Sequence, residues 1–157
     1  MIQRVFSLFF IILAFEQMVF SEEVELTPEK ERRIESDVIY TFETIIDLCK
    51  RERFDEIYEY GDRYSRERMS KEMFMSQHKR CGLASSWETV QDIEVEIISP
   101  THVYVRAKLG FKGPRVYGIT GRTEFQRRIS EMRLEDGEWR IDLNHPLGVE
   151  ERRQDQK

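Results

Sequence analysis

The stretch Thr123–Leu143, TEFQRRISEMRLEDGEWRIDL, decides the fold because it predicts one long β-hairpin. Its centre is Asp136-Gly137, a pair that suits a type I′ turn, in which both central residues need a positive φ. Alternating apolar and charged residues flank this turn on both sides, as expected of two strands that each bury one face. The stretch therefore predicts an antiparallel sheet at the C-terminal end of the chain.

A two-residue loop gives this hairpin one apolar face. It places Leu134 opposite Trp139 and collects the charged side chains on the other face, whereas a three-residue loop would mix the two sets. Because burial of a clean apolar face outweighs a few exposed like-charge pairs, we expect the two-residue register. Phe125 is out of phase with the apolar face, so we also expect a β-bulge near residues 129–131.

The residues before the sheet show helical patterns. Thr27-Pro28 predicts the start of a long helix, since Thr suits the N-cap and Pro the first helical position. A short second helix is predicted over Phe54–Tyr60, and a third over Lys71–Arg80 with Ser70 as its cap. The polar stretch Asp62–Met69 between them is predicted to be a loop.

From Thr89 onward the apolar period changes to two. Two strands are predicted, around 93–97 and 103–111, joined by a turn at Ser99-Pro100. Helices followed by antiparallel strands predict an α+β fold, with N-terminal helices packed on a curved antiparallel sheet.

The N-terminus predicts a signal peptide. Arg4 precedes the eleven residues VFSLFFIILAF, which are too few to span a bilayer but suit the apolar region of an export signal. Val19 and Ser21 fit a cleavage site before Glu22. We therefore expect an exported protein, periplasmic or secreted, with no stable membrane span after cleavage; an uncleaved anchor is the alternative.

The remaining chain is long enough for one domain with one core. We expect residues 1–21 to be the signal peptide, 22–149 to form the α+β domain, and 150–157 to be a disordered charged tail. The whole chain has 157 residues and a net charge of −5. An exported acidic protein is a poor candidate for nucleic-acid binding, so we expect no nucleic acid as a partner.

The charges are unevenly distributed along the chain. Glu22–Asp62 carries 14 acids and 6 bases, whereas Arg106–Arg133 carries 8 bases and 2 acids. Acidic helices beside a basic sheet, or two solvated faces, would explain this pattern. The alternative is that the basic strands meet an anionic partner.

Thr27–Leu143 resembles the nuclear transport factor 2-like superfamily, the cystatin-like cone. The resemblance rests on a long first helix, a short aromatic second helix (FDEIYEY), a capped third helix (SKEMF) and a hairpin ending in DGEWRIDL. Small exported members of unknown function share the Gly-x-Trp-x-Ile pattern of the last strand. The superfamily contains both enzymes and non-catalytic binding modules, so the likeness alone implies no activity. Relatives commonly dimerise through the outer face of the curved sheet, so the resemblance makes a homodimer through the sheet one possible state, and the sequence leaves the oligomeric state open.

The enzymes of this fold, ketosteroid isomerase and the polyketide cyclases, hold a carboxylate base and an acid or Tyr inside an apolar cone. By that resemblance Tyr40 or Tyr58 could donate a proton, and Asp47 or Asp62 could act as the base. None of the four lies in a recognisable motif of those enzymes. A Tyr at the rim of the core and an Asp on a solvated surface are the simpler interpretations.

Metal and cofactor sites are not indicated. The histidines His78, His102 and His145 are far apart in the sequence, and no His/Cys/Asp cluster has ligand spacing. His78 near Cys81 lacks a third, orienting group for a catalytic pair. We therefore predict no catalytic residue, no metal ligand and no cofactor.

These observations predict an exported, non-catalytic binding or interaction domain whose partner is a small apolar ligand or a protein. Phe42, Tyr58 and Trp139 are the candidates to line or fill its cavity. The alternatives are a small enzyme of the isomerase or cyclase type and a peptide- or cell-wall-binding accessory module. A buried carboxylate in an open cone would favour the enzyme, and a filled cone the interaction domain.

The chain has two cysteines, Cys49 and Cys81. Export to an oxidising compartment favours a disulfide between them, and both are predicted at helix ends that pack on the same sheet. Such a bridge would stabilise the domain by roughly 3–4 kcal/mol in the chain-entropy model. Two unpaired buried thiols are the alternative.

Overall fold

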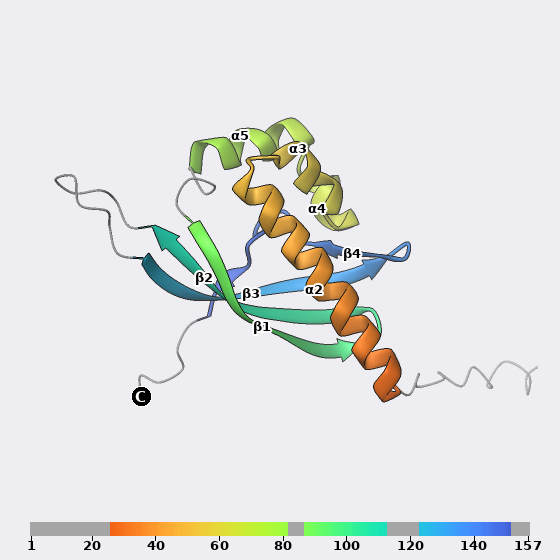
Figure 1. The fold of residues 1–157 in the computed structure, drawn as a ribbon. Coiled ribbons are helices and arrows are strands. Elements are labelled where there is room, and N and C mark those ends of the chain that lie inside the picture. The colour runs from red at the N-terminus through yellow and green to blue at the C-terminus, as the bar shows by residue number, and fades with distance from the viewer. Residues whose placement is uncertain (1–25, 82–86, 113–122, 152–157) are drawn as a thin grey trace, which may run out of the picture.

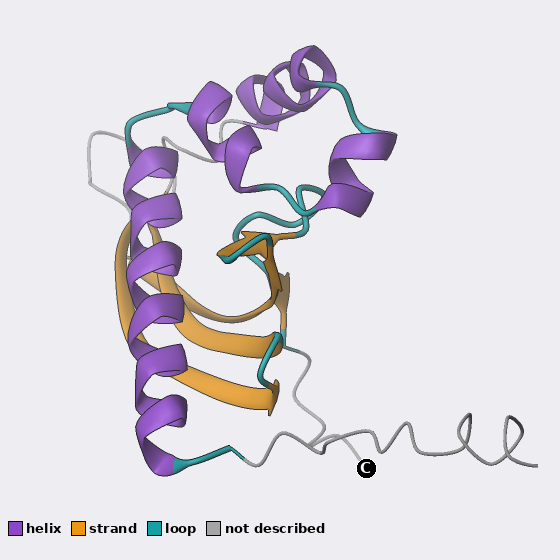
Figure 2. Ribbon diagram, turned by 90° about the vertical axis from the view of Figure 1, so that its right-hand side faces the viewer, coloured by secondary structure: helices purple, strands orange, loops and turns teal. Residues whose placement is uncertain are grey.

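The computed structural model describes residues 26–81, 87–112 and 123–151. A long helix, α2, crosses one face of a curved antiparallel sheet, and shorter helices gather beyond its C-terminal end (Figures 1 and 2). This arrangement confirms the predicted α+β class. The predicted signal peptide lies outside the described residues.

In chain order the elements are α2 (Pro28–Lys50), α3 (Phe54–Ile57), the 3₁₀ helix η1 (Tyr58–Tyr60), α4 (Arg63–Arg68), α5 (Lys71–Cys81), β1 (Trp87–Ser99), β2 (His102–Lys112), β3 (Thr123–Glu135), β4 (Glu138–Ile141) and β5 (Val149–Glu150). The strands lie in the order β1-β2-β3-β4, and β5 pairs with β3. No helix in these described ranges is long and apolar enough to cross a membrane.

Helix α2 begins as predicted. The Thr27 hydroxyl accepts a hydrogen bond from the Lys30 backbone N–H at 3.3 Å, and Pro28 occupies the first turn. One side of the helix is buried along its whole length; its residues are Ile34, Val38, Phe42, Ile45, Ile46 and Cys49. This stripe packs on the inner face of the sheet and forms the core with it.

The hairpin has the predicted turn and register. Asp136 has a φ of 51° and Gly137 a φ of 83°, so both central residues take the positive values of a type I′ turn. The paired residues are Met132–Ile141, Arg133–Arg140, Leu134–Trp139 and Glu135–Glu138. Strand β4 ends at Ile141, so the pairing is shorter than the sequence predicted.

The predicted bulge in β3 is wrong. Strand β3 pairs with β2 without interruption, and Phe125 stays on the outer face with 49% of its surface exposed. The irregularity lies in β1 instead, where the register shifts between Gln91 and Glu94 and Asp92 has a φ of 50°. The sheet therefore adjusts its curvature at its edge strand, where an extra residue disturbs only one neighbour.

The predicted loop at Asp62–Met69 contains a helix, α4. The Asp62 carboxylate caps it by accepting the Ser65 backbone N–H at 2.6 Å, and the Ser65 hydroxyl accepts the Leu143 N–H at 3.2 Å. The segment has no apolar stripe, so its helical state depends on this capping and on contact with a distant part of the chain. Helical periodicity alone could not reveal it.

The predicted tail begins with ordered residues. Val149–Glu150 forms β5, and the Glu151 N–H donates to the Arg127 carbonyl at 3.0 Å. Gly148 permits this approach, because its φ is 74° and a Cβ there would lie 2.5 Å from the Ile129 carbonyl oxygen. The remaining predicted tail lies outside the described residues.

The predicted disulfide is wrong, because Cys49 is a free, buried cysteine. Its side chain belongs to the inward stripe of α2, and desolvation raises the pKa of its thiol to about 12. Cys49 therefore acts as a small core side chain. The side chain of Cys81, the predicted partner, lies outside the described residues.

Candidate functional site

A groove of about 750 Å³ lies between the N-terminal half of α2 and the β3–β4 hairpin. The wall on α2 is formed by Lys30, Arg33, Ile34, Asp37, Tyr40 and Thr41. The opposite wall includes Tyr60, Leu134, Glu138, Trp139 and Arg140. The groove thus lies at the end of the sheet that carries the hairpin turn.

The apolar surface of the groove follows from the hairpin register. Leu134 and Trp139 are cross-strand partners on the inner face, so their side chains project towards α2. Trp139 is only 5% exposed, and Leu134 is partly buried against the core. Tyr60 comes from the end of η1, which a bridge between Gly61 and Ile141 holds beside β4. The groove therefore has an apolar base that the core supports.

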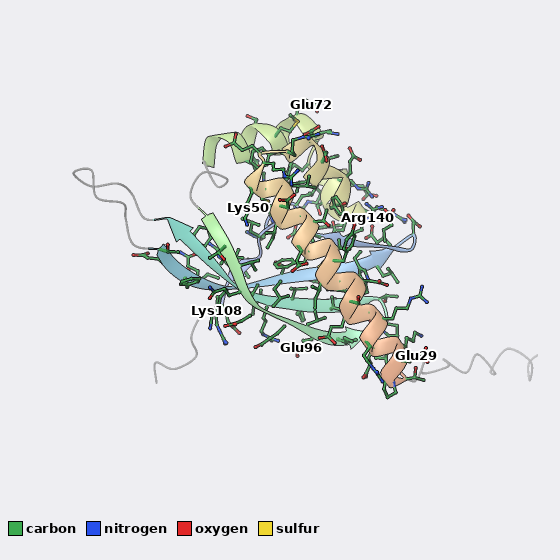
Figure 3. The ribbon with its side chains drawn as sticks, viewed as in Figure 1. Glu29, Lys50, Glu72, Glu96, Lys108 and Arg140 are labelled. Atoms are coloured by element: carbon green, nitrogen blue, oxygen red, sulfur yellow. The ribbon has the colours of Figure 1, made fainter. Side chains whose placement is uncertain are left out.

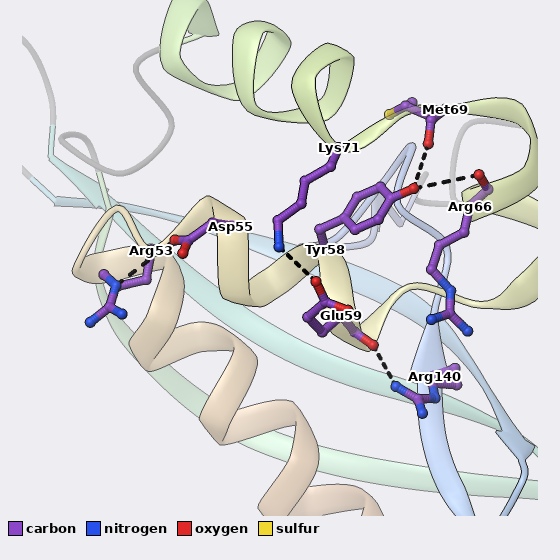
Figure 4. Close-up of polar contacts among 8 residues, drawn as sticks. All are labelled: Arg53, Asp55, Tyr58, Glu59, Arg66, Met69, Lys71 and Arg140. Carbon is purple, nitrogen blue, oxygen red and sulfur yellow. Dashed lines mark hydrogen bonds and ion pairs between the residues drawn. The ribbon is translucent and has the colours of Figure 1, made fainter.

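The charged groups at its edge are mostly paired. Glu59 forms an ion pair with Lys71 at 2.6 Å, and its backbone carbonyl accepts a hydrogen bond from Arg140 (Figure 4). Arg140 also pairs with Glu138. The hydrogen bond to Glu59 is the main cause that raises the pKa of Lys71. These contacts link η1, α5 and β4 and fix the wall opposite α2.

On α2, Arg33 lies 3.9 Å from Asp37, whereas Lys30 makes no ion pair within the described part of the chain. The ammonium group of Lys30 can therefore meet an acidic group of a ligand without breaking an existing contact.

The three predicted cavity residues do not meet in one cavity. Phe42 is 1% exposed and lies in the core, and Trp139 forms part of the groove. The Tyr58 hydroxyl donates to the Met69 carbonyl at 2.9 Å, which ties η1 to the residues before α5 (Figure 4). Of the three, Trp139 alone belongs to the residues that line this groove.

Three of the four residues considered as acids or bases of an enzyme, Asp47, Tyr58 and Asp62, have structural partners, and the fourth, Tyr40, is exposed. Asp62 is buried and caps α4, as described above. Asp47 is exposed and forms an ion pair with Arg51 at 3.0 Å. Tyr40 is 74% exposed on α2, so it does not lie in the buried apolar cavity that a catalytic proton donor of this type requires.

The histidines do not form a site. His78 is buried beside Phe54 and Phe74, with ring centroids 5.8 Å and 4.3 Å away. Desolvation lowers the pKa of His78, which favours the neutral ring in this apolar stack. Within the described ranges, no group of three His, Cys, Asp or Glu side chains could hold a metal ion.

The outer face of the sheet carries Arg106, Lys108 and Arg127 of the basic segment that the sequence identified, whereas Arg115 and Arg122 lie outside the described residues. Figure 3 shows Glu96 and Lys108 on the face away from α2. Arg106 pairs with Glu96, and Lys108 pairs with Asp92. The hydrogen bond from Lys108 is the main cause that lowers the pKa of Asp92.

Glu151 adds a further acid to the outer face, 3.5 Å from Arg106 and 3.9 Å from Arg127. Arg106, Lys108 and Arg127 are therefore balanced by acids from β1 and from the end of the described chain. This supports the solvated-face interpretation over an anionic partner at these residues.

Sequence reasoning missed most of the groove. The hairpin register alone identified Leu134 and Trp139 as inward-facing, but Tyr60 and Ile34 join them through tertiary packing. The local sequence around Ile34 and the local sequence around Tyr60 do not indicate that the two residues share a surface.

No family model matches the chain, and no curated protein is significantly similar to it.

Proposed function

We propose that the protein is an exported, non-catalytic binding domain that receives a small apolar ligand or an apolar segment of a protein partner. The groove between α2 and the β3–β4 hairpin is the proposed binding surface. The observation that carries this proposal is the filled interior. Phe42, Leu109 and Met132 occupy the space between α2 and the sheet, and the groove of about 750 Å³ remains beside them.

Binding is favoured over catalysis because Asp47, Tyr58 and Asp62 already have structural partners and Tyr40 is exposed rather than buried in a cone. Asp62 caps a helix, and Tyr58 donates to a backbone carbonyl. The Tyr58 proton is therefore already donated, and Asp62 lies beside the charged side chains of Glu131, Arg133 and Asp142 rather than inside an apolar cone. The aromatic and aliphatic side chains of the groove instead suit a ligand held by contact area.

We also propose that the protein is exported and that it is a member of the nuclear transport factor 2-like superfamily. The order of a long helix, shorter helices and an antiparallel sheet supports a nuclear transport factor 2-like domain. Intact mass of the secreted chain tests the export signal. A mass that begins at Glu22 supports it, and a membrane-bound chain that retains residues 1–21 contradicts it.

The groove is tested with 8-anilinonaphthalene-1-sulfonate, an apolar anionic probe whose fluorescence rises on burial. Thr41→Trp should fill the groove and weaken binding of the probe by roughly tenfold, which corresponds to about 1.4 kcal/mol. Tyr64→Ala is the matched control, because Tyr64 is 59% exposed and lies on α4 rather than at the groove. Equal binding by both variants would contradict the proposed surface.

The enzyme alternative has a separate test. A 3-oxo-Δ5-steroid should remain unchanged when incubated with the protein. Turnover that disappears in Tyr58→Phe would establish catalysis and overturn the non-catalytic proposal.

A further inference from the structure

We propose that two copies of this chain associate through the exposed side of α2, as an antiparallel helix pair related by a two-fold axis. The contact surface is the α2 stripe formed by Arg32, Glu35, Ser36, Ile39, Tyr40 and Glu43, which lines a shallow, open hollow of about 440 Å³. This surface is distinct from the outer face of the sheet, and it borders the groove at Tyr40.

Tyr40 is the first reason to assign a partner to this stripe. It is 74% exposed, more than any other large hydrophobic side chain in the described residues. It lines both the groove and the hollow on α2. A rigid aromatic side chain beside a concavity is the kind of residue that dominates protein interfaces.

The charges of the stripe are the second reason. Arg32, Glu35 and Glu43 form no ion pair with any described residue. Arg32 Nε donates only to the Pro28 carbonyl at 3.2 Å. Elsewhere on the same helix, Arg33 pairs with Asp37 at 3.9 Å and Arg51 with Asp47 at 3.0 Å. The stripe thus keeps charges of both signs available for another molecule.

The spacing of these residues makes a second copy the fitting partner. In an antiparallel pair with its axis at the midpoint between residues 37 and 38, residues at equal distances from that midpoint face each other. Arg32 then faces Glu43 of the other copy, and Ser36 faces Ile39. Tyr40 faces Glu35, whose carboxylate can accept a hydrogen bond from the phenol.

Every charged member of the stripe therefore meets a complementary group when the helix is paired with itself. The small side chain of Ser36 leaves room for Ile39, so the two helices can approach closely. The spacing of three and four residues along Arg32, Ser36, Ile39 and Glu43 is the spacing of a helix-packing seam.

The outer face of the sheet offers less for such a contact. Its charged residues Arg106 and Lys108 already pair with acids of the same sheet. A partner would have to break those pairs or bury them, and both carry a desolvation cost. The α2 stripe carries no such internal pairing.

The strength of the contact follows from its size. The stripe from Arg32 to Glu43 spans roughly 17 Å at 1.5 Å per residue. Two such stripes bury less than about 1,200 Å², which places the interface at the small end of specific contacts. We therefore expect a reversible dimer whose population depends on protein concentration.

Sedimentation velocity of purified Arg32→Glu and Glu43→Arg variants tests the pairing. Each variant places like charges opposite each other twice in its own dimer, so the dissociation constant should rise by roughly tenfold or more. An equimolar mixture should form a heterodimer, because the carboxylate introduced at position 32 of one copy then faces the guanidinium introduced at position 43 of the other. The double variant in one chain should regain the wild-type dissociation constant.

Circular dichroism of each variant checks that α2 remains folded, and two further variants locate the interface. Tyr40→Ala should weaken the dimer, whereas Phe125→Ser on the outer face of the sheet should leave it unchanged. A wild-type chain that stays monomeric up to about 1 mM would overturn the proposal. So would a dimer that charge reversal does not weaken, a mixture that forms no heterodimer, or a dimer that Phe125→Ser abolishes.

Discussion

The two faces of the sheet are held by different forces. The inner face packs against α2 and consists of buried apolar side chains, among them Val103, Val105, Leu109 and Met132, each with no exposed surface. The outer face is a set of partly exposed ion pairs such as Arg106–Glu96 and Lys108–Asp92. Burial contributes about 25 cal/mol per Å² of apolar surface, whereas an exposed ion pair contributes about 0–1 kcal/mol.

The difference means that the same sheet should respond very unequally to substitution on its two sides. Loss of an inner side chain leaves a cavity that the close-packed surroundings fill only in part. Loss of an outer charge leaves a group that water can solvate. Four experiments test this contrast: two act on the two faces of the sheet, and two act on buried polar side chains of the helical region.

The largest effect is expected for Trp139→Ala. Trp139 lies on the inner face with 5% of its surface exposed, so its removal should lower the free energy of unfolding by about 3–5 kcal/mol. Urea denaturation of the variant and the wild type measures the difference. A loss below about 1 kcal/mol would mean that the inner face does not hold the fold as described.

A smaller loss is expected for Asp62→Ala. This buried carboxylate caps α4 through the Ser65 N–H, and replacing a capping side chain costs about 1–2 kcal/mol. The control is Asp37→Ala, which removes an exposed pair with Arg33. The control should change stability by less than about 0.5 kcal/mol in the same denaturation experiment.

A graded effect of pH is expected from His78. Burial between aromatic rings lowers its pKa from 6.5, so the unfolded chain takes up the proton first as the pH falls. The stability that neutral His78 contributes is therefore complete above about pH 6.5 and decreases below it. Thermal unfolding between about pH 7.5 and 5.5 measures this decrease.

His78→Phe keeps a ring in the aromatic stack and removes the titrating group. Its melting temperature should depend less on pH over that range than that of the wild type. An unchanged pH dependence would assign the effect to other groups.

The smallest effect is expected on the outer face. Replacing Arg106 and Lys108 by Gln should change the free energy of unfolding by less than about 1 kcal/mol, because their ion pairs are solvent-exposed. The pKa of Asp92 should rise towards its ordinary value, since the hydrogen bond from Lys108 is the main cause that lowers it. A larger loss of stability would show that the outer face is a cooperative network and would remove the contrast between the two faces.

Local patterns in the sequence identified the elements that are stabilised by residues close to one another in the sequence. The Asp136-Gly137 turn can form only with two positive φ angles, and alternation on both sides then leaves one register with an apolar face. The Thr27-Pro28 start and the inward stripe of α2 follow equally from capping and helical period. Each of these features depends on residues within a few positions of one another.

Contacts between distant residues decided the rest. Helix α4 depends on Ser65 meeting Leu143, and the groove depends on Ile34, Tyr60 and Trp139 coming together from three elements. The sequence established that Cys49 faces the core, but tertiary packing left it a free thiol. A linear pattern records the spacing of residues along one element. It does not record which side chains of separate elements converge, because that depends on packing of the whole chain.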